Sequence, residues 1–230
     1  MAKGYIQRAI IQSGGGLGGI ISTKSLQDAE EAGKAMWEAS GYTTLEQMRA
    51  CPTDKFQEVM MTYMKTLKTF NGLPYSPCVD GQLLEASVHD VALQNNELDI
   101  PYMIGYTSED IAPPVMKKAA VDWSLLLEKQ GRQPAYVYCF SRDLPGEDMP
   151  AAQGGFGDMK GAFHSSELWY MFGTLDKCWR PMEKVDYELS ERMVSYWTNF
   201  AKTGSPNGEG LPVWKPCTKA DNHIQDLNVK

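Results

Sequence analysis

Tyr102-Met-Ile-Gly-Tyr-Thr-Ser-Glu-Asp-Ile111 and Gly161-Ala-Phe-His-Ser-Ser-Glu-Leu168 are the two stretches that decide the fold. Each is linked to a short apolar run of the kind that forms a buried strand, and each places ionisable side chains in the turn beyond it. In α/β proteins such turns gather at the carboxyl edge of the sheet, where ligands bind. The two stretches therefore predict strands whose ends carry the chemistry.

Three apolar runs predict strands, at residues 5–12, 100–105 and 135–140. Helical patterns lie between them and form a long excursion after the first strand. Strands that alternate with helices favour an α/β fold with a parallel sheet and crossover helices. No internal repeat or linker is apparent, so we expect one domain over residues 1–230. Three strands are few for this many helices, and the domain is expected to be incomplete.

Helix-start signals occupy the intervals between these strands. Ser25 precedes Asp28 by three residues, and Thr43 precedes Glu46 by three, which is the spacing of a capping box. A last amphipathic helix is expected over residues 186–202. Its inward side chains are expected to be Tyr187, Val194, Trp197 and Phe200.

The composition excludes several classes of function. The net charge is −7 and no basic run occurs, which argues against binding to nucleic acid or to an anionic membrane surface. No window is apolar for long enough to span a membrane, and the first residues lack a signal-peptide core, so a cytoplasmic location is expected. The five cysteines form no Cys-x-x-Cys pair, which predicts reduced thiols and no metal site.

His164 is the strongest candidate for a catalytic side chain. A histidine in a loop beyond a strand can act as a general base if a carboxylate orients its ring. Glu109 and Asp110 follow the preceding strand, and either carboxylate has the position to do so. The structural alternatives are an exposed histidine and two carboxylates that cap the next helix. Spacing alone does not choose between Glu109 and Asp110.

The glycine cluster Gly14–Gly19 matches Gly-x-Gly-x-x-Gly, the dinucleotide fingerprint, only weakly. No helix begins at the third glycine, and no second strand ends in an acidic residue about 20 positions on. We therefore predict a loop and no cofactor. Ser13 has Ile11 where a nucleophile elbow needs glycine, which favours a structural role, and Gly-x-Ser-x-Gly occurs nowhere in the 230 residues.

Four stretches, in this order and spacing, resemble the C-terminal part of the type-B carboxylesterases, and the resemblance covers essentially the whole chain. The stretches are Gln7-Arg-Ala-Ile-Ile-Gln-Ser-Gly14, Ile104-Gly-Tyr-Thr-Ser-Glu-Asp110, Gly161-Ala-Phe-His-Ser-Ser-Glu-Leu168 and Tyr196-Trp-Thr-Asn-Phe-Ala-Lys-Thr-Gly-Ser-Pro-Asn207. The resemblance implies the C-terminal portion of an α/β-hydrolase fold, a small-molecule carboxylic ester as substrate, and no cofactor.

The resemblance also implies roles for individual residues. His164 matches the catalytic histidine of the family. The position of the family's acid, counted from Gly105, falls on Asp110, with Glu109 beside it, and we favour Asp110. The acyl side of the substrate pocket is expected at three residues of the glycine loop, namely Gly18, Gly19 and Ile20.

In this family the nucleophile elbow and the oxyanion loop precede the strand at residues 5–12. We therefore expect a chain with little activity alone, whose partner is a missing N-terminal half. The strand would then have an unpaired edge, which predicts self-association. The alternative function is a non-catalytic interaction module with an esterase-like fold.

Overall fold

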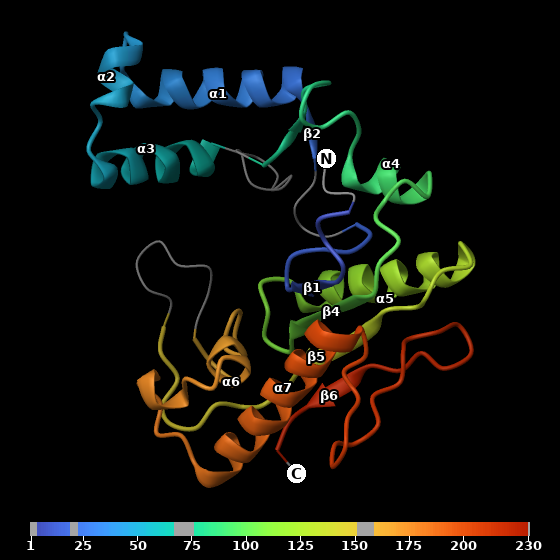
Figure 1. Cartoon of the computed structure of the whole chain (residues 1–230). Helices are drawn as coiled ribbons and strands as arrows, with labels where there is room; N and C mark the ends of the chain where they lie inside the picture. The colour runs from blue at the N-terminus through green and yellow to red at the C-terminus, as the bar shows by residue number, and fades with distance from the viewer. Residues whose placement is uncertain (1–3, 19–22, 67–75, 151–158, 230) are drawn as a thin grey trace. The chain divides into compact units, whose positions relative to one another are not determined.

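The structure, a computed structural model, describes residues 4–18, 23–66, 76–150 and 159–229. Its main sheet has the order β1-β4-β5-β6, and every neighbouring pair is parallel (Figure 1). The strands are β1 (Ala9–Gln12), β4 (Tyr102–Thr107), β5 (Tyr136–Phe140) and β6 (Gln225–Leu227). The predicted parallel α/β architecture is confirmed.

Within the main sheet, the prediction of three strands was wrong by one, because β6 was missed. The two-residue strands of the smaller sheet, at residues 24–25 and 78–79, were also not predicted. The sequence of β6 is Gln225-Asp-Leu227, and only the last of these residues is buried. Such a strand has no apolar run to reveal it, and it is set by its pairing with β5 at the sheet edge. By contrast, all six residues of β4 are buried, as expected for a central parallel strand.

Two long helices cover opposite faces of the central strands. Met103, Tyr138 and Phe140 pack on the side of α7 (Lys184–Thr203). Ile104 and Val137, the alternate residues of the same strands, pack on the side of α5 (Pro113–Lys129). Because successive side chains of a strand point to opposite faces, this division places one helix on each face. The sheet is therefore buried on both sides at β4 and β5.

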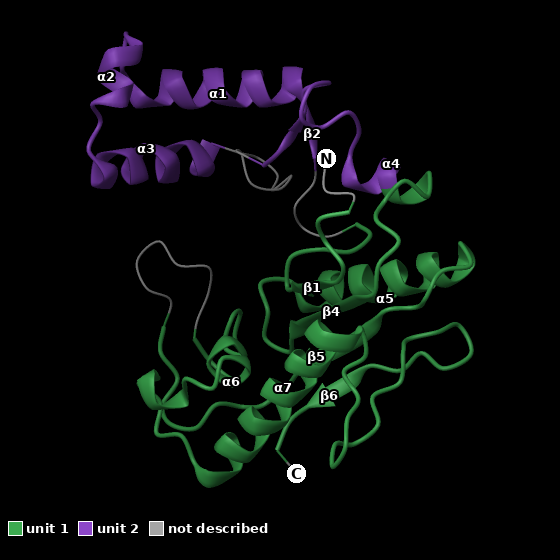
Figure 2. Ribbon diagram, in the orientation of Figure 1, with its two compact units in different colours: residues 1–20, 92–230 green, residues 21–91 purple. Residues whose placement is uncertain are grey.

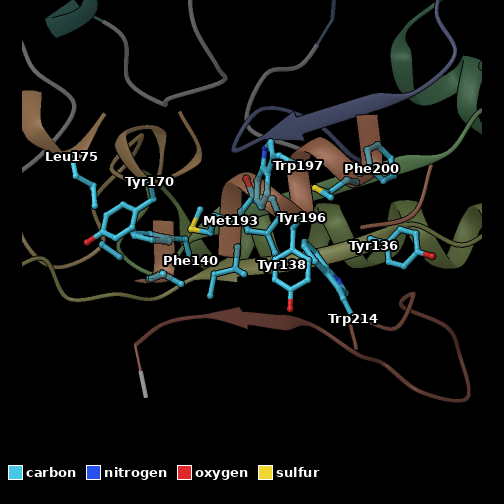
Figure 3. Close-up of a cluster of buried hydrophobic side chains, with 14 of the residues drawn as sticks. Tyr136, Tyr138, Phe140, Tyr170, Leu175, Met193, Tyr196, Trp197, Phe200 and Trp214 are labelled. Carbon is cyan, nitrogen blue, oxygen red and sulfur yellow. The ribbon is translucent and has the colours of Figure 1, made fainter. Parts of the chain in front are cut away.

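Aromatic side chains dominate the core on the α7 face (Figure 3). Trp214 is fully buried, and its ring lies 5.3 Å from Tyr196 and 6.2 Å from Tyr138 in edge-to-face arrangements. Tyr138 also meets Trp197 at 5.2 Å. Such pairs contribute about 0.5–1.5 kcal/mol each beyond the burial of apolar area. This cluster therefore joins the long helix α7, strand β5 and the loop before β6 into one body.

The inward face of α7 differs in part from the prediction. Trp197 and Phe200 are buried as expected, but Tyr187 is 46% exposed. The buried stripe begins one residue earlier, at Asp186, and continues at helical spacing through Leu189, Ser190, Met193 and Tyr196. Tyr187 lies about 100° around the helix from Asp186, which is enough to turn it to the solvent.

Residues 21–91 form a second compact unit, and residues 1–20 with 92–230 form the first (Figure 2). The second unit pairs β2 (Lys24–Ser25) with β3 (Cys78–Val79) and holds α1 (Leu26–Ser40), α2 (Leu45–Arg49) and α3 (Thr53–Thr66). The helix α4 (Val88–Leu93) crosses the boundary between the units, and α6 (Leu168–Met171) and the 3₁₀ turn η1 (Leu175–Lys177) belong to the first unit. The expectation of one domain stays a prediction.

One of the two capping predictions is confirmed. The Ser25 side chain accepts a hydrogen bond from the backbone N–H of Asp28 and caps α1. The capping box of α2 is formed by Thr44 and Gln47, one residue beyond the predicted pair. Gln47 forms the same reciprocal hydrogen bond that a glutamate would form. Thr43 with Glu46 and Thr44 with Gln47 have the same spacing, and both fit the capping-box pattern.

Gly105 provides a test of the sheet. A Cβ atom at this position would lie 2.3 Å from the ring of Tyr138, its register partner on β5. We expect Gly105→Ala to lower the free energy of unfolding by about 1–3 kcal/mol through overpacking, measured by urea denaturation. Gly33→Ala is the control, because a Cβ in the middle of α1 meets nothing within 4 Å. Equal tolerance of both substitutions would contradict this account of the sheet.

Candidate active site

The turns that carry Asp110 and His164 are held together by the backbone. Asp110 lies three residues beyond the end of β4. A parallel bridge joins Glu109 to Phe163, and the N–H of Glu109 donates to the carbonyl of Ala162 at 3.1 Å. This bridge brings the histidine turn, which is distant in sequence, directly beside the acid turn.

His164 and Asp110 form a short hydrogen bond. The Nδ1 atom of His164 lies 2.7 Å from Oδ1 of Asp110. The Asp110 side chain is fully buried, whereas that of His164 is 37% exposed. Because an ionised carboxylate only accepts hydrogen bonds, Nδ1 carries the proton and Nε2 is left as the basic nitrogen. The arrangement can therefore orient an imidazole for general-base chemistry.

Three further donors satisfy the Asp110 carboxylate. The hydroxyl of Ser13 donates to Oδ2 at 2.5 Å, and the backbone N–H of Thr107 donates to the same oxygen at 3.1 Å. The N–H of Ile111 donates to Oδ1 at 2.9 Å. With His164, the donors number four, and they come from the end of β4 and from the segments that follow β1, β4 and β5.

These contacts set the protonation states of the pair. Burial raises the pKa of the Asp110 carboxyl, but hydrogen bonds from His164, Ser13 and the backbone outweigh it and hold this pKa below its usual value. The hydrogen bond to Asp110 raises the pKa of His164, although burial opposes the shift. The carboxylate thus stays ionised, and the imidazole becomes a stronger base.

Glu109 lies outside this pair. Its side chain is exposed and lines a separate surface cavity of about 340 Å³ with Ser108, Asp143 and Lys160. No hydrogen bond joins Glu109 to His164 among the described residues. Adjacent residues in an extended turn point in opposite directions, so only one of the two carboxylates can meet the ring. The geometry pairs His164 with Asp110.

Two of the residues around the pair have left-handed backbone conformations without being glycine. Ser13 has φ +50° and Ser165 has φ +72°. Such conformations cost on the order of 1 kcal/mol or more and are retained where the surroundings enforce them, often at functional sites. Here they turn the Ser13 hydroxyl toward Asp110 and redirect the chain directly after His164.

The glycine loop has a packing role. Gly16 has φ +101°, and a Cβ there would lie 2.4 Å from the carbonyl oxygen of Ala119 in α5. The N–H of Leu17 donates to that same oxygen at 3.1 Å. The glycine therefore allows a close approach of two backbones. Gly18 is exposed with φ +80°. Of the three predicted substrate-binding residues, Gly19 and Ile20 lie outside the described residues.

Sequence reasoning missed a second buried carboxyl group. Glu167 is 1% exposed, and its Oε1 accepts a hydrogen bond from Nε2 of Gln12 at 3.3 Å. Its Oε2 has no partner within the part of the chain that the structure describes. Burial raises the pKa of this carboxyl. The signal in the sequence was a glutamate three residues after His164, directly before the apolar run of α6.

The ranges described contain no helix long and apolar enough to cross a membrane. In the same ranges, no group of three or more His, Cys, Asp or Glu side chains is placed to bind a metal ion.

With this geometry established, comparison with known proteins identifies the family. The model of the carboxylesterase family matches residues 1–120 and 115–230. The chain belongs to the carboxylesterase family. Carboxylesterase 5A of Canis lupus familiaris is 38% identical over 77 residues, which are 30% of this chain and 13% of the dog protein. Carboxylesterase 1C of Mus musculus is 22% identical over 98% of this chain and 51% of its own length.

Solved structures of esterases share the fold. A thermophilic PNB esterase superposes with a TM-score of 0.73 at 19% identity, over 99% of this chain and 55% of that one. A carboxylesterase of Geobacillus stearothermophilus gives a TM-score of 0.70 at 18% identity, over 99% and 56%. The chain therefore spans about half the length of the esterase structures that it matches.

The acid of the pair can be tested by titration. We expect Asp110→Asn to lower the pKa of His164, because the anion that stabilises the imidazolium is removed. In the unaltered chain, the pair's contribution to stability is complete below the ordinary histidine pKa of about 6.5 and is lost as the pH rises through the raised value. NMR titration of the imidazole measures the pKa, and urea denaturation at a series of pH values measures the stability. Glu109→Gln is the matched control and should leave the pKa of His164 unchanged; an equal shift would contradict the pairing.

The role of Ser13 can be separated from its backbone strain. Ser13→Ala removes one donor from the buried Asp110 carboxylate while keeping a Cβ at φ +50°, and should cost about 1–3 kcal/mol of stability. Ser13→Gly removes the same donor but tolerates this φ, so it should cost less. Urea denaturation at neutral pH compares the two variants. An alanine variant as stable as the unaltered chain would show that the hydrogen bond does not matter.

Proposed function

We propose that this chain supplies the base and the orienting acid of a serine carboxylesterase. The hydrogen bond between His164 and Asp110 supports the proposal most directly. In this mechanism a serine hydroxyl attacks the carbonyl of a carboxylic ester, and Nε2 of His164 takes its proton. His164 then protonates the leaving alcohol, and Asp110 stabilises the imidazolium. Water repeats the sequence on the acyl-enzyme.

The nucleophile of the proposed site comes from outside these 230 residues. The sequence contains no Gly-x-Ser-x-Gly elbow. The hydroxyl of Ser13 is already directed at Oδ2 of Asp110, on the carboxylate rather than on the basic nitrogen of the ring. Ser13 therefore acts as a positioning residue for the acid. A polypeptide segment with a serine elbow and oxyanion donors completes the site.

We also propose a substrate, a low activity for the chain alone, its self-association and its location. The substrate is a small-molecule carboxylic ester, with its acyl group toward Gly18, Gly19 and Ile20. Without oxyanion donors, a contribution of about 3–4 kcal/mol to the barrier is lacking, so these residues alone turn over little or no ester. The chain self-associates when no partner is present, and its location is cytoplasmic.

A reactivity probe tests where the nucleophile lies. We expect a fluorophosphonate to leave the intact mass of the purified chain unchanged, and a short-chain nitrophenyl ester to remain unhydrolysed. A stoichiometric adduct on Ser13 with turnover would overturn the assignment of this residue.

The second part of the experiment supplies the missing segment. The sequence directly upstream of this chain in its genome should encode Gly-x-Ser-x-Gly, and co-expression of that segment should give both adduct and hydrolysis. His164→Ala should then lower kcat about a hundred-fold or more, whereas His223→Ala, in the C-terminal tail, should not. An assembled pair without hydrolysis would instead favour the non-catalytic interaction module, and an upstream sequence without a serine elbow would contradict the proposed function.

A further inference from the structure

Phe163, the residue directly before His164, is packed among aromatic rings. Its side chain is 8% exposed. The ring of Trp169 meets it edge to face with the centroids 6.0 Å apart, and the ring of Trp179 stacks on it at 6.4 Å. The two indole rings also meet edge to face, at 5.0 Å. These three side chains form the Phe163 cluster, which encloses the residue that leads into the histidine turn.

Both tryptophans come from segments that are anchored in the core. Trp169 lies in α6, whose Tyr170 is fully buried, and Trp179 lies two residues beyond η1, whose Leu175 is 3% exposed. Tyr170 and Leu175 belong to the buried cluster on the α7 face (Figure 3). The indole rings are therefore held against the histidine turn by backbone that is itself fixed.

Arg180 holds the chain just before the histidine turn. Its side chain is 1% exposed, and Nη2 donates to the carbonyl of Met159 at 2.6 Å. Oδ1 of Asp148 lies 3.6 Å from the same nitrogen. Hydrogen bonds from an ionised donor are among the stronger ones in proteins. Met159 precedes His164 by five residues, so the segment that carries Trp179 also fixes the start of the loop that leads to the histidine.

The histidine turn has a strained backbone that needs support from outside. Ser165, directly after His164, has φ +72° although it is not glycine. Such a conformation persists where the surrounding structure enforces it. The N–H of Ser166 donates to the carbonyl of Phe163 at 3.0 Å, and a parallel bridge ties Phe163 to the acid turn. The packing of two indole rings on Phe163 adds a side-chain restraint to these backbone contacts.

Trp179 is the exposed member of the cluster. It is 52% exposed, whereas Phe163 is 8% exposed. The stabilisation that an apolar side chain provides scales with the area it removes from water, so a half-exposed indole adds less to the core than a buried one. Its aromatic contacts are with Phe163 and Trp169. The effect of this side chain is therefore concentrated beside the residue that precedes His164.

We propose that Trp179, acting through Phe163, is a positioning residue that holds the imidazole of His164 against the carboxylate of Asp110. The ring of Phe163 packs on Trp179, and the next residue places Nδ1 at 2.7 Å from Asp110. Hydrogen bonds weaken steeply when their geometry is disturbed, so loosening Phe163 loosens this bond. The importance of the positioning for ester hydrolysis rests on the proposed function, whereas the positioning itself can be measured without a substrate.

Trp179→Ala tests the positioning in the full 230-residue chain. Native-state hydrogen exchange is followed by NMR at the amide of Ser166, which bonds the carbonyl of Phe163, and at the amides of the buried strand β4. We expect the Ser166 amide to exchange about tenfold faster and β4 to be unchanged, because only the turn is loosened. The pKa of His164 should fall toward its ordinary value, because the hydrogen bond to Asp110 that raises it forms less often.

Two further variants serve as controls. Trp179→Phe keeps a ring against Phe163 and should restore both the exchange rate and the pKa of His164. Phe172→Ala should change neither, since Phe172 is 66% exposed and lies outside the Phe163 cluster. An unchanged pKa of His164 in Trp179→Ala would overturn the positioning. Equal acceleration of exchange at Ser166 and throughout β4 would also overturn it, because Trp179 would then support the fold as a whole.

The positioning and the proposed function can fail separately. A lowered pKa of His164 in Trp179→Ala, in a protein that fails the reactivity and co-expression tests, would leave the positioning standing and overturn the proposed function. Ester hydrolysis that depends on His164, with an imidazole pKa that Trp179→Ala does not change, would do the reverse.

Discussion

The buried carboxylate of Asp110 is the group on which the rest of the site depends. It accepts hydrogen bonds from Ser13 after β1, from Thr107 and Ile111 around the end of β4, and from His164 after β5. Burial without these donors would raise its pKa and remove the charge that stabilises the imidazolium. One anion therefore joins three adjacent segments of the sheet edge and tunes the base at the same time.

The sheet that positions this anion is packed more tightly around β5 than around β1. Toward β5 and β6, the aromatic cluster around Trp214 and the close approach of Gly105 to Tyr138 fix the strands. Toward β1, the four residues of the strand are half-buried, and within the described ranges β1 pairs with β4 alone.

The chain belongs to the carboxylesterase family. The chain covers 55% and 56% of two esterase structures that superpose on it, so each of them is nearly twice as long as the part that is matched. Within the chain, the strained turns at Ser13 and Ser165 are retained although no nucleophile elbow is present. Such conformations cost on the order of 1 kcal/mol or more and are found most often at functional sites.

Local patterns in the sequence determined the parallel α/β architecture, strands β4 and β5, the cap of α1 and the candidacy of His164. Apolar runs, capping residues and turn residues act over a few positions, and so they can be recognised without the fold. The short polar strand β6 and the burial of Glu167 have no such local cause. The resemblance favoured Asp110 over Glu109 as the partner of His164, but the spacing of the residues did not choose between them, and the tertiary structure shows the pairing. Both carboxylates follow the same strand, and only the bridge at Phe163 and the donors from other segments determine which one is buried against the imidazole.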